Sequence, residues 1–349
     1  MNPVGHPAAR LPLLALAWLY GGAIRIRNRY YDRPSASRRA GVPVISVGNL
    51  TVGGTGKTPL VWWLAGRLLD EGHKPAIVSR GYGGRAGRGP LLVSRGAGPL
   101  CGPAECGDEP YLLASILDGV SVIVGSNRTA GARAAAASGH DVVILDDGFQ
   151  HRRLARDLDI VLVDAGEPLG EERLLPAGRL REPLLGLARA DVLLISGCRR
   201  GETLDSVERL VRSHNLRAPI LRTGYRRTGF FDAAGRRAER PGRALAFCAI
   251  GNPARFRRDL EDEGIEIADF ESWRDHHRYG RAELARLRAR AFELNAVLIT
   301  TEKDRVRLPP FEREGTSVPL LTLRIEADPF DPQPLLAAVR GAVQGGRSH

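Results

Sequence analysis

Cysteine is scarce in this chain of 349 residues, which contains only Cys101, Cys106, Cys198 and Cys248. The one close pair is spaced C-x₄-C and has no histidine beside it. Structural zinc sites join four Cys or His ligands at short, regular spacings, so four scattered thiols do not fit that class of site. We expect reduced thiols in a cytosolic protein.

Signatures of nucleic-acid binding are also missing from the sequence. There is no zinc finger, no RNA-binding sheet signature, no basic helix with interleaved aromatics and no internal repeat. Positive charge, in contrast, is abundant: 51 Lys and Arg against 40 Asp and Glu leave a formal charge of +11, nearly all of it on arginine. A basic surface favours anionic partners. Since nucleic acid is not expected, anionic lipid and polyphosphate are the partners that remain.

A long apolar run is the third feature that the chain lacks. The N-terminal uncharged stretch, Leu11–Ile24, is too short to span a bilayer, which takes about 20 apolar residues. A signal peptide has an apolar region of this length, but only Arg10 stands before it, and a core helix would have the same pattern. Arginines follow from Arg25 onward. We therefore expect residues 1–34 to form a helix that lies in the membrane interface.

A glycine-rich loop follows the apolar run that ends at Val47. Its residues are Thr51, Val52, Gly53, Gly54, Thr55, Gly56, Lys57 and Thr58. Between a strand and a helix, the backbone N–H groups of such a loop cradle a polyphosphate, while Lys57 reaches the β and γ oxygens and the Thr58 hydroxyl binds Mg²⁺. The strict P-loop motif has glycine where this chain has Thr51, but the flanking strand and helix are where the chemistry needs them. We predict a nucleotide site with ATP and Mg²⁺.

The pattern from Val42 onward predicts an α/β fold, with a P-loop NTPase-like parallel sheet wrapped by helices. Continuous apolar runs alternate with helical stretches, which is typical of strands buried on both faces. The runs are Val42–Val47, Ala76–Val78, Val120–Val124, Val142–Leu145, Ile160–Val163 and Val192–Ile195. We assign residues 35–222 to this core domain, with a loop from Gly81 to Gly107 that has at most a short strand.

A second, smaller α/β domain is expected after polar residues interrupt the pattern between Leu221 and Gly235. We assign it residues 223–310, and expect residues 311–349 to return to the core domain. The predicted elements are strands at Ala244–Ile250, Ala296–Ile299 and Val318–Ile325 and helices at Arg281–Leu294 and Pro334–Val343.

Two carboxylate pairs are candidates for chemistry. Asp146 and Asp147 close a buried strand, where Mg²⁺ in a phosphate-loop protein needs a second protein contact, and adjacent carboxylates require a cation or an arginine nearby. Asp108 and Glu109 begin a helix, where they could cap it, or act as the base that takes a hydroxyl proton and as a metal ligand. The spacing leaves both readings of the second pair open.

Several histidines and arginines are further candidates. His276 follows Asp275, and it is either a plain interdomain histidine or a base tuned by a carboxylate. The arginines near predicted strand ends or helix starts could each hold a phosphate, although in so basic a chain any one of them could be an ordinary surface residue. The candidates for substrate binding are Arg80, Arg128, His151, Arg179 and Arg181.

Taken together, the motifs resemble the tetraacyldisaccharide 4'-kinase family, the lipid A 4'-kinases of Gram-negative bacteria. The resemblance runs from the N-terminal helix to Asp304 in motif order. It rests on Gly48–Pro59, Ser79–Gly83, Gly107–Pro110, Asp146–His151, Leu175–Pro183, Asp275–His276 and Thr301–Asp304. A first loop position without glycine, as at Thr51, is what this family looks like.

The resemblance implies ATP-dependent phosphorylation of the 4'-hydroxyl of a tetraacylated glucosamine disaccharide 1-phosphate at the cytoplasmic face of the inner membrane. It also implies that Asp108 is the catalytic base and is paired with His276 across a domain cleft. Thr58, Glu109 and Asp146 would surround Mg²⁺. Because the pair lies on two predicted domains, we expect domain closure to assemble it.

Two other classes of protein share part of this pattern. A membrane-associated ATPase of the partitioning or targeting type would phosphorylate no small molecule, but it carries a lysine just before the loop glycines, where this chain has Thr51 and Val52. A GTP-dependent metal chaperone would need clustered Cys and His. No obligate protein partner is evident from the sequence.

Overall fold

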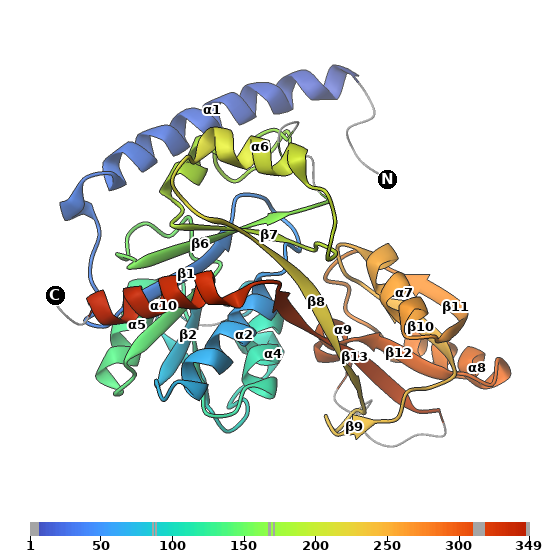
Figure 1. Ribbon diagram of the computed structural model, residues 1–349. Coiled ribbons are helices and arrows are strands. Elements are labelled where there is room, and N and C mark those ends of the chain that lie inside the picture. The colour runs from blue at the N-terminus through green and yellow to red at the C-terminus, as the bar shows by residue number, and fades with distance from the viewer. Residues whose placement is uncertain are drawn as a thin grey trace.

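A computed structural model of the protein describes residues 7–85, 87, 89–166, 169, 172–309 and 318–346 (Figure 1). Its strands are β1 Val44–Asn49, β2 Pro75–Ser79, β3 Leu91–Arg95, β4 Ser121–Val124, β5 Val142–Asp146, β6 Leu158–Asp164, β7 Val192–Ser196, β8 Ile220–Phe231, β9 Arg237–Ala238, β10 Arg243–Cys248, β11 Glu266–Ser272, β12 Val297–Thr301 and β13 Leu320–Pro329.

The helices lie between these strands in sequence. They are α1 Pro7–Tyr31, η1 Pro34–Ala36, α2 Lys57–Asp70, α3 Pro103–Cys106, α4 Asp108–Ile116, α5 Arg128–Ala137, η3 Leu184–Arg189, α6 Asp205–His214, α7 Pro253–Asp262, α8 Arg281–Glu293, α9 Glu302–Val306 and α10 Pro332–Gly346. The α/β fold class is therefore confirmed, and the predicted strands lie within a few residues of the observed ones.

The described strands form one sheet, in the order β11-β10-β12-β13-β8-β7-β6-β1-β5-β2-β4-β3, with β9 paired to β8. The expected parallel arrangement holds for most neighbours, but β3 with β4, β9 with β8 and β13 with β8 pair antiparallel. The predicted parallel sheet is confirmed for most neighbours, and these three pairs are the exceptions. Strand β13 is antiparallel to β8 because it returns from the C-terminal half and enters the sheet in the opposite direction.

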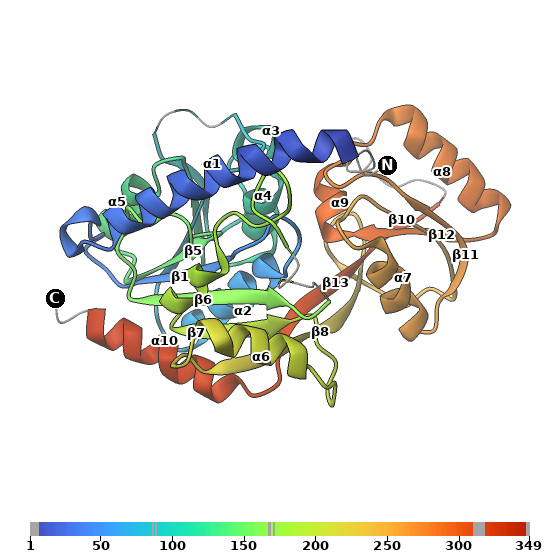
Figure 2. The same ribbon diagram turned by 90° about the horizontal axis from the view of Figure 1, so that it is seen from above.

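Both faces of the sheet are buried, as the continuous apolar runs predicted. In the N-terminal half, α2, α4 and α10 pack on one face, while α5, η3 and α6 pack on the other. In the C-terminal half, α7 and α8 cover opposite faces of β10, β11 and β12 (Figure 2). Helix α7 and strand β11 were not predicted. Helix α7 is rich in polar residues and strand β11 is only half buried, so neither has a strong apolar pattern.

The long strands β8 and β13 join the two halves (Figure 1). The predicted boundary at residue 222 falls inside β8, where the chain pairs with β7 at one end and with β13 along the rest. The other boundary, at residue 310, lies outside the described residues. The division of the chain into domains stays a prediction.

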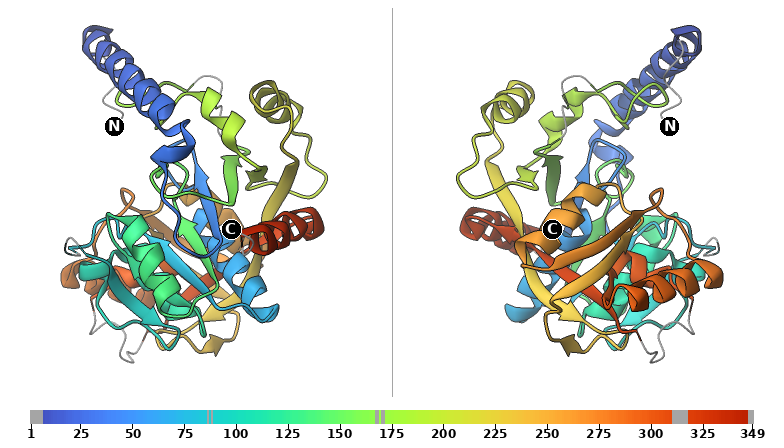
Figure 3. Two further views of the ribbon diagram at one scale, coloured as in Figure 1. Left: turned by 90° about the vertical axis from the view of Figure 1, so that its left-hand side faces the viewer. Right: turned by 90° about the vertical axis from the view of Figure 1, so that its right-hand side faces the viewer.

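Helix α1 projects from the body of the protein (Figure 3). Tyr20 Oη donates to the carbonyl oxygen of Arg181 at 2.7 Å, and Asn28 Nδ2 donates to Glu182 Oε2 at 3.1 Å, so one side of the helix is fixed to the segment before η3. In the described part of the chain, no helix has the length and apolar character needed to cross a membrane.

Candidate active site

The glycine-rich loop connects β1 to α2, as predicted. Two of its glycines have backbone angles that favour glycine, with φ of 126° at Gly53 and 81° at Gly56. A Cβ atom at Gly53 would meet the guanidinium of Arg179, and one at Gly56 would meet the Tyr225 hydroxyl. These positions therefore need glycine both for backbone conformation and for space.

Lys57 is the first residue of α2 and points back towards the end of β1. Its Nζ donates to Asn49 Oδ1 at 3.0 Å and to Thr55 Oγ1 at 3.5 Å, and it lies 3.5 Å from Asp147 Oδ1. The side chain is only 10% exposed. The ammonium group is thus held by neutral oxygens and one carboxylate beside the loop, and Thr58 is buried next to it.

The segment before η3 forms one wall of the loop. Leu180 pairs with Thr51 as an antiparallel bridge, and the N–H of Val52 donates to the carbonyl oxygen of Arg179 at 2.8 Å. The guanidinium of Arg179 donates back to the carbonyl oxygen of Val52 through Nε at 3.1 Å and Nη2 at 2.8 Å. Two of the arginines named from the sequence, Arg179 and Arg181, therefore lie at the phosphate loop.

Three basic side chains, those of Lys57, Arg128 and Arg181, lie around Asp147. Arg181 Nη1 donates to both of its carboxylate oxygens, at 2.8 and 2.7 Å, and Arg128 Nη1 donates to its carbonyl oxygen at 2.8 Å. Burial alone would raise the pKa of Asp147, but Lys57 and Arg181 outweigh it and hold that pKa below the usual value. Asp147 is therefore ionised at neutral pH, with the arginine partner that the sequence argument required.

Asp146 has the opposite environment. Asp146 is only 1% exposed. Ser79 Oγ donates to its Oδ2 at 3.1 Å, and its Oδ1 is buried without a hydrogen-bond partner. Burial, with smaller contributions from the charges of Glu109 and Asp147, raises the pKa of Asp146 to about 6.

A buried carboxylate oxygen without a partner fits a hard cation such as Mg²⁺. Among the described residues, no three His, Cys, Asp or Glu side chains gather as a metal site. Mg²⁺ nevertheless needs few protein ligands, because waters and substrate phosphates complete its octahedral shell. The donor set at the end of β5 is therefore compatible with a metal that binds together with nucleotide.

Asp108 and Glu109 open α4 and face the C-terminal half. Lys303 Nζ donates to Glu109 Oε1 at 2.6 Å. The charge of Lys303 lowers the pKa of Glu109 to about 2. The ion pair joins α4 to α9 and keeps this carboxylate ionised.

Asp108 and His276 meet at Arg307. Arg307 Nε donates to Asp108 Oδ2 at 2.8 Å, Arg307 Nη2 lies 3.2 Å from His276 Nδ1, and the Asp108 Oδ2 to His276 Nδ1 distance is 3.7 Å. Burial would raise the pKa of Asp108, but His276 and Arg307 outweigh it and lower that pKa. The structure already brings the two residues within 3.7 Å of each other, and domain closure as the step that assembles them stays a prediction.

Arg307 and Lys303 are site residues that the sequence reasoning did not identify. The Arg307 side chain is 1% exposed, and Nη1 also donates to the carbonyl oxygen of Ala249 at 2.8 Å. The sequence does contain a pattern that indicates both residues. Lys303 lies in the Thr301–Asp304 motif, and Arg307 follows it by four residues, a spacing that places two side chains on the same side of a helix.

The remaining substrate-binding candidates from the sequence differ in how far they are buried. Arg128 is buried and contacts Asp147, whereas Arg80 is exposed. His151 Nε2 is buried without a hydrogen-bond partner. Burial and then the charges of nearby arginines lower the pKa of His151 to about 4, so its ring is neutral at neutral pH. The structure thus brings Arg128, Arg179 and Arg181 to the loop region and leaves Arg80 at the surface.

This arrangement can be compared with known proteins. A model of the Tetraacyldisaccharide-1-P 4'-kinase family matches residues 9–344. The chain belongs to this family. The family assignment confirms the resemblance stated from the motifs, and it does not favour the partitioning or targeting ATPase.

Members of the tetraacyldisaccharide-1-P 4'-kinase family from several bacteria are similar over most of the chain. The tetraacyldisaccharide 4'-kinase of Syntrophus aciditrophicus (strain SB) is 42% identical over 342 residues, covering 91% of this chain and 90% of the relative. That of Anaeromyxobacter dehalogenans (strain 2CP-C) is 43% identical over 339 residues, covering 94% and 88%.

A solved structure of the same family supports the fold. The chain is similar to LpxK from Aquifex aeolicus, crystallised as an "apo" form in complex with ATP, with a TM-score of 0.77 and 31% sequence identity. The similarity covers 96% of this chain and 99% of the Aquifex chain. The α/β architecture of this tetraacyldisaccharide-1-P 4'-kinase family member is therefore that of its solved relative.

Proposed function

We propose that this protein is a lipid kinase that transfers the γ-phosphoryl group of ATP to the 4'-hydroxyl of a tetraacylated glucosamine disaccharide 1-phosphate. The observation that carries the proposal is the contact of Lys57 with Asp147 at a phosphate loop, next to the buried Asp146, in a chain of this family. The test is transfer itself, with purified protein, ATP, Mg²⁺ and the lipid disaccharide. ATP hydrolysis without a phosphorylated lipid would favour an ATPase instead.

Nucleotide binding is assigned to the loop and its wall. We assign the phosphates to the backbone N–H groups of residues 51–58 other than those of Val52 and Thr55, which already donate to carbonyl oxygens. Lys57 neutralises charge on the transferring group. We assign Thr58 and Asp146 as holders of Mg²⁺, with Asp147 and Glu109 nearby. When bound, Mg²⁺ supplies positive charge to the β and γ phosphates. We assign Arg80, Arg128, His151, Arg179 and Arg181 to the acceptor; Arg80 is exposed, Arg128 is buried, and Arg179 also forms the wall of the loop.

Asp108 is assigned as the group that takes the proton of the 4'-hydroxyl. Oδ2 already accepts from Arg307, so we assign Oδ1 to the hydroxyl proton. Arg307 and His276 orient the carboxylate. The lowered pKa of Asp108 makes it a weak base, which agrees with phosphoryl transfer, since the loose transition state of kinases asks little of the base.

The raised pKa of Asp146 predicts how the Mg²⁺ requirement depends on pH. A carboxyl must lose its proton to bind metal, and below a pKa of about 6 each pH unit lowers the ionised fraction roughly tenfold. The Mg²⁺ concentration for half-maximal activity should therefore rise steeply as the pH falls from about 7 to 5, and change little above 7.

The matched control is Asp146→Asn, which removes the titrating group. This variant should need more Mg²⁺ at every pH and lose the steep dependence below pH 6. Activity should be measured against Mg²⁺ concentration at fixed, saturating ATP. A wild-type Mg²⁺ requirement that does not change between pH 7 and 5 would contradict the assignment of Asp146.

Helix α1 is proposed to bind the cytoplasmic face of the inner membrane. Apolar side chains on its outward side are strongly exposed, with Trp18 at 74%, Leu19 at 61% and Ile26 at 75%, while Ala17 and Ile24 are buried. Arginines follow along the same helix. An amphipathic segment of this kind binds the interface through its apolar side and through attraction to anionic lipid.

The double variant Trp18→Glu, Ile26→Glu should weaken binding to anionic vesicles by on the order of tenfold or more without lowering the Tm. Both side chains are exposed, so their replacement leaves the packed side of α1 unchanged. Vesicle co-sedimentation measures the effect. Leu216→Glu is the matched control, because Leu216 is 79% exposed and lies outside α1. Equal losses in both variants would show that α1 is not the binding segment.

A further inference from the structure

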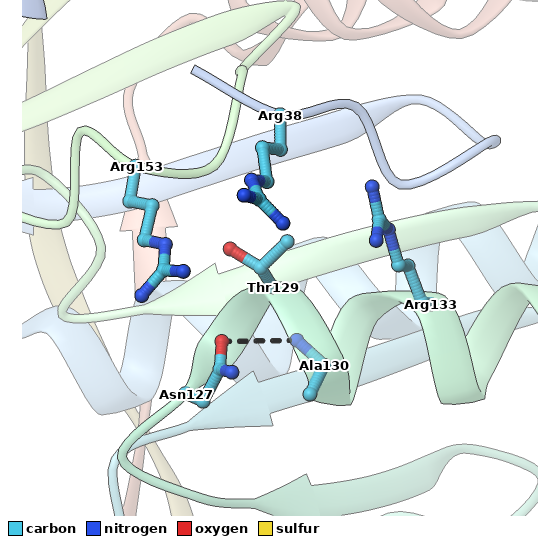
Figure 4. Close-up of a pocket in the computed structure, with 6 residues that line it drawn as sticks. All are labelled: Arg38, Asn127, Thr129, Ala130, Arg133 and Arg153. Carbon is cyan, nitrogen blue, oxygen red and sulfur yellow. Dashed lines mark hydrogen bonds between the residues drawn. The ribbon is translucent and has the colours of Figure 1, made fainter. Parts of the chain in front are cut away.

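A cavity of about 300 Å³ lies at the first turn of α5, the helix that begins with Arg128. Three separate segments form it: the chain after η1, the chain after His151, and α5. Its lining residues are Arg38, Asn127, Thr129, Ala130, Arg133 and Arg153. Figure 4 shows the guanidinium groups of Arg38, Arg133 and Arg153 around the Thr129 side chain.

The cavity is lined by positive charge that no lining carboxylate neutralises. No acidic side chain is among its lining residues. In the part of the chain that the structure describes, the guanidinium groups of Arg38, Arg133 and Arg153 form no ion pair with a carboxylate; Arg133 Nε donates only to the carbonyl oxygen of Arg39, at 3.3 Å. Most other arginines near them are paired, as Arg152 is with Asp32 and Arg156 with Asp159. All three arginines are exposed, so their guanidinium groups are accessible to an anion from solution, and their combined positive potential attracts one.

The backbone holds the arginines in place. Arg38 N–H donates to the carbonyl oxygen of Arg153 at 2.8 Å, and the carbonyl oxygen of Arg38 accepts from the N–H of Ala155 at 3.0 Å. Residues from the linker after α1 and from the loop after β5 are therefore fixed side by side. The backbones of Arg38 and Arg153 are fixed next to each other, while the side chains of Arg38, Arg133 and Arg153 are exposed.

Thr129 adds a second, independent sign of a ligand. The residue is 4% exposed and lines the cavity, yet its Oγ1 is buried without a hydrogen-bond partner. A buried hydroxyl without a partner lowers the stability of the fold, because it has given up its hydrogen bonds to water. A ligand oxygen in the cavity would accept from this hydroxyl.

The helix supplies the last component. Asn127 Oδ1 caps the N–H of Ala130 at 3.3 Å, and the carbonyl oxygen of Asn127 accepts from the N–H groups of Ala130 and Gly131 at 3.0 and 3.2 Å. The N–H groups of Arg128 and Thr129 are left at the open end of the helix. α5 spans ten residues, so its N-terminus carries a partial positive charge towards the cavity. Guanidinium groups, a hydroxyl and a helix N-terminus together match the tetrahedral oxygens of phosphate.

We propose that this cavity binds a phosphate group, separately from the phosphate loop. The source of the phosphate is a lipid or the free ion: the 1-phosphate of the acceptor, a phospholipid headgroup, or inorganic phosphate. Arg128 separates the two sites, since its Nη1 turns to the carbonyl oxygen of Asp147 while the next residue, Thr129, lines the cavity. Binding of phosphate itself does not depend on the proposed kinase activity; only the assignment to the acceptor lipid rests on it.

Titration calorimetry of the full chain with inorganic phosphate, at ionic strength fixed with chloride, tests the proposal. Arg133→Ala, Arg153→Ala and Thr129→Val should each weaken one binding component by about tenfold, as loss of a hydrogen bond to a charged group predicts. Thr129→Val should not lower the Tm, because it removes an unpartnered hydroxyl. Lys57→Ala should abolish only phosphate binding at the loop.

Arg209→Ala is the matched control, since Arg209 is an exposed arginine on α6 outside the cavity. If it weakens phosphate binding as much as Arg133→Ala, or if Lys57→Ala abolishes all phosphate binding, the proposal is overturned. A Thr129→Val variant with a lower Tm and unchanged phosphate affinity would overturn it as well.

Three further measurements on Arg133→Ala identify the source once phosphate binding is shown. A raised KM for the lipid disaccharide with unchanged kcat and unchanged KM for ATP supports the acceptor 1-phosphate. A weaker interaction with phosphatidylglycerol vesicles, at unchanged KM, supports a phospholipid headgroup. Unchanged values in both assays support the free ion. A protein without kinase activity that still shows the cavity component would refute the proposed function and leave this site intact.

Discussion

Lys57→Ala is expected to lower kcat by on the order of 10² or more while the fold stays intact. The ammonium group is nearly buried and held between Asn49, Thr55 and Asp147, so its position is set before nucleotide binds. A fixed charge of this kind stabilises the transition state without reorganisation. Its loss also removes the cation beside the Asp147 carboxylate, which should weaken binding of ATP without Mg²⁺.

The control for this variant is Lys74→Ala, which removes an exposed lysine from the turn before β2. It should keep the wild-type kcat. Circular dichroism and Tm should be compared for both variants, because the loss of activity has meaning only in a folded protein. A folded Lys57→Ala enzyme with near-normal turnover would refute the assignment of the phosphate loop.

Asp108→Ala and His276→Ala should show strongly non-additive losses in kcat. Asp108→Ala alone is expected to cost about 10² to 10³, and the double variant should be little worse, because a base loses most of its value when the groups that orient it are removed. Both residues contact Arg307, which couples them. The measurement is a double-mutant cycle on kcat at saturating ATP and lipid.

The control is His277→Ala, the neighbouring histidine, which lies 3.1 Å from Glu283 and does not contact Asp108. It should leave kcat within about twofold. Arg307→Lys keeps the charge but loses the two-armed contact, so it should lower kcat with little change in KM for ATP. Strictly additive losses for Asp108 and His276 would mean that they act independently. Full activity of Asp108→Ala would leave Asp108 with only its structural ion pair to Arg307.

Much of the fold was predictable because it depends on local patterns. Strands such as β1, β5 and β7 are continuous apolar runs, and burial on both faces produces such runs directly. The direction of β13 was not predictable, because pairing with β8 joins residues about 100 positions apart and no local pattern encodes it. Strand β11 could not be predicted for a different reason. It lies at the edge of the sheet and is only half buried, so its apolar pattern is weak.

The candidate site divides in a similar way. The phosphate loop and the pair at the end of β5 follow from contiguous motifs, so the sequence locates them. Arg307 and Lys303 could not be assigned in this way, since their partners Asp108 and Glu109 are nearly 200 residues away. Their importance appears only when α4 and α9 pack together. The unpartnered Oδ1 of Asp146 could not be predicted either, because residue spacing does not show which side-chain atoms the fold buries.

The sheet shared by the two halves has a consequence for how the protein unfolds. Because β8 and β13 hydrogen-bond along eight registered pairs, neither half could be excised as a fragment without exposing a long strand edge. Melting of one half would remove the neighbouring strand of the other, so the two should lose structure in one cooperative transition. The phosphate loop belongs to one half and Arg307 to the other, and heat would therefore abolish nucleotide binding and the orientation of Asp108 at the same temperature.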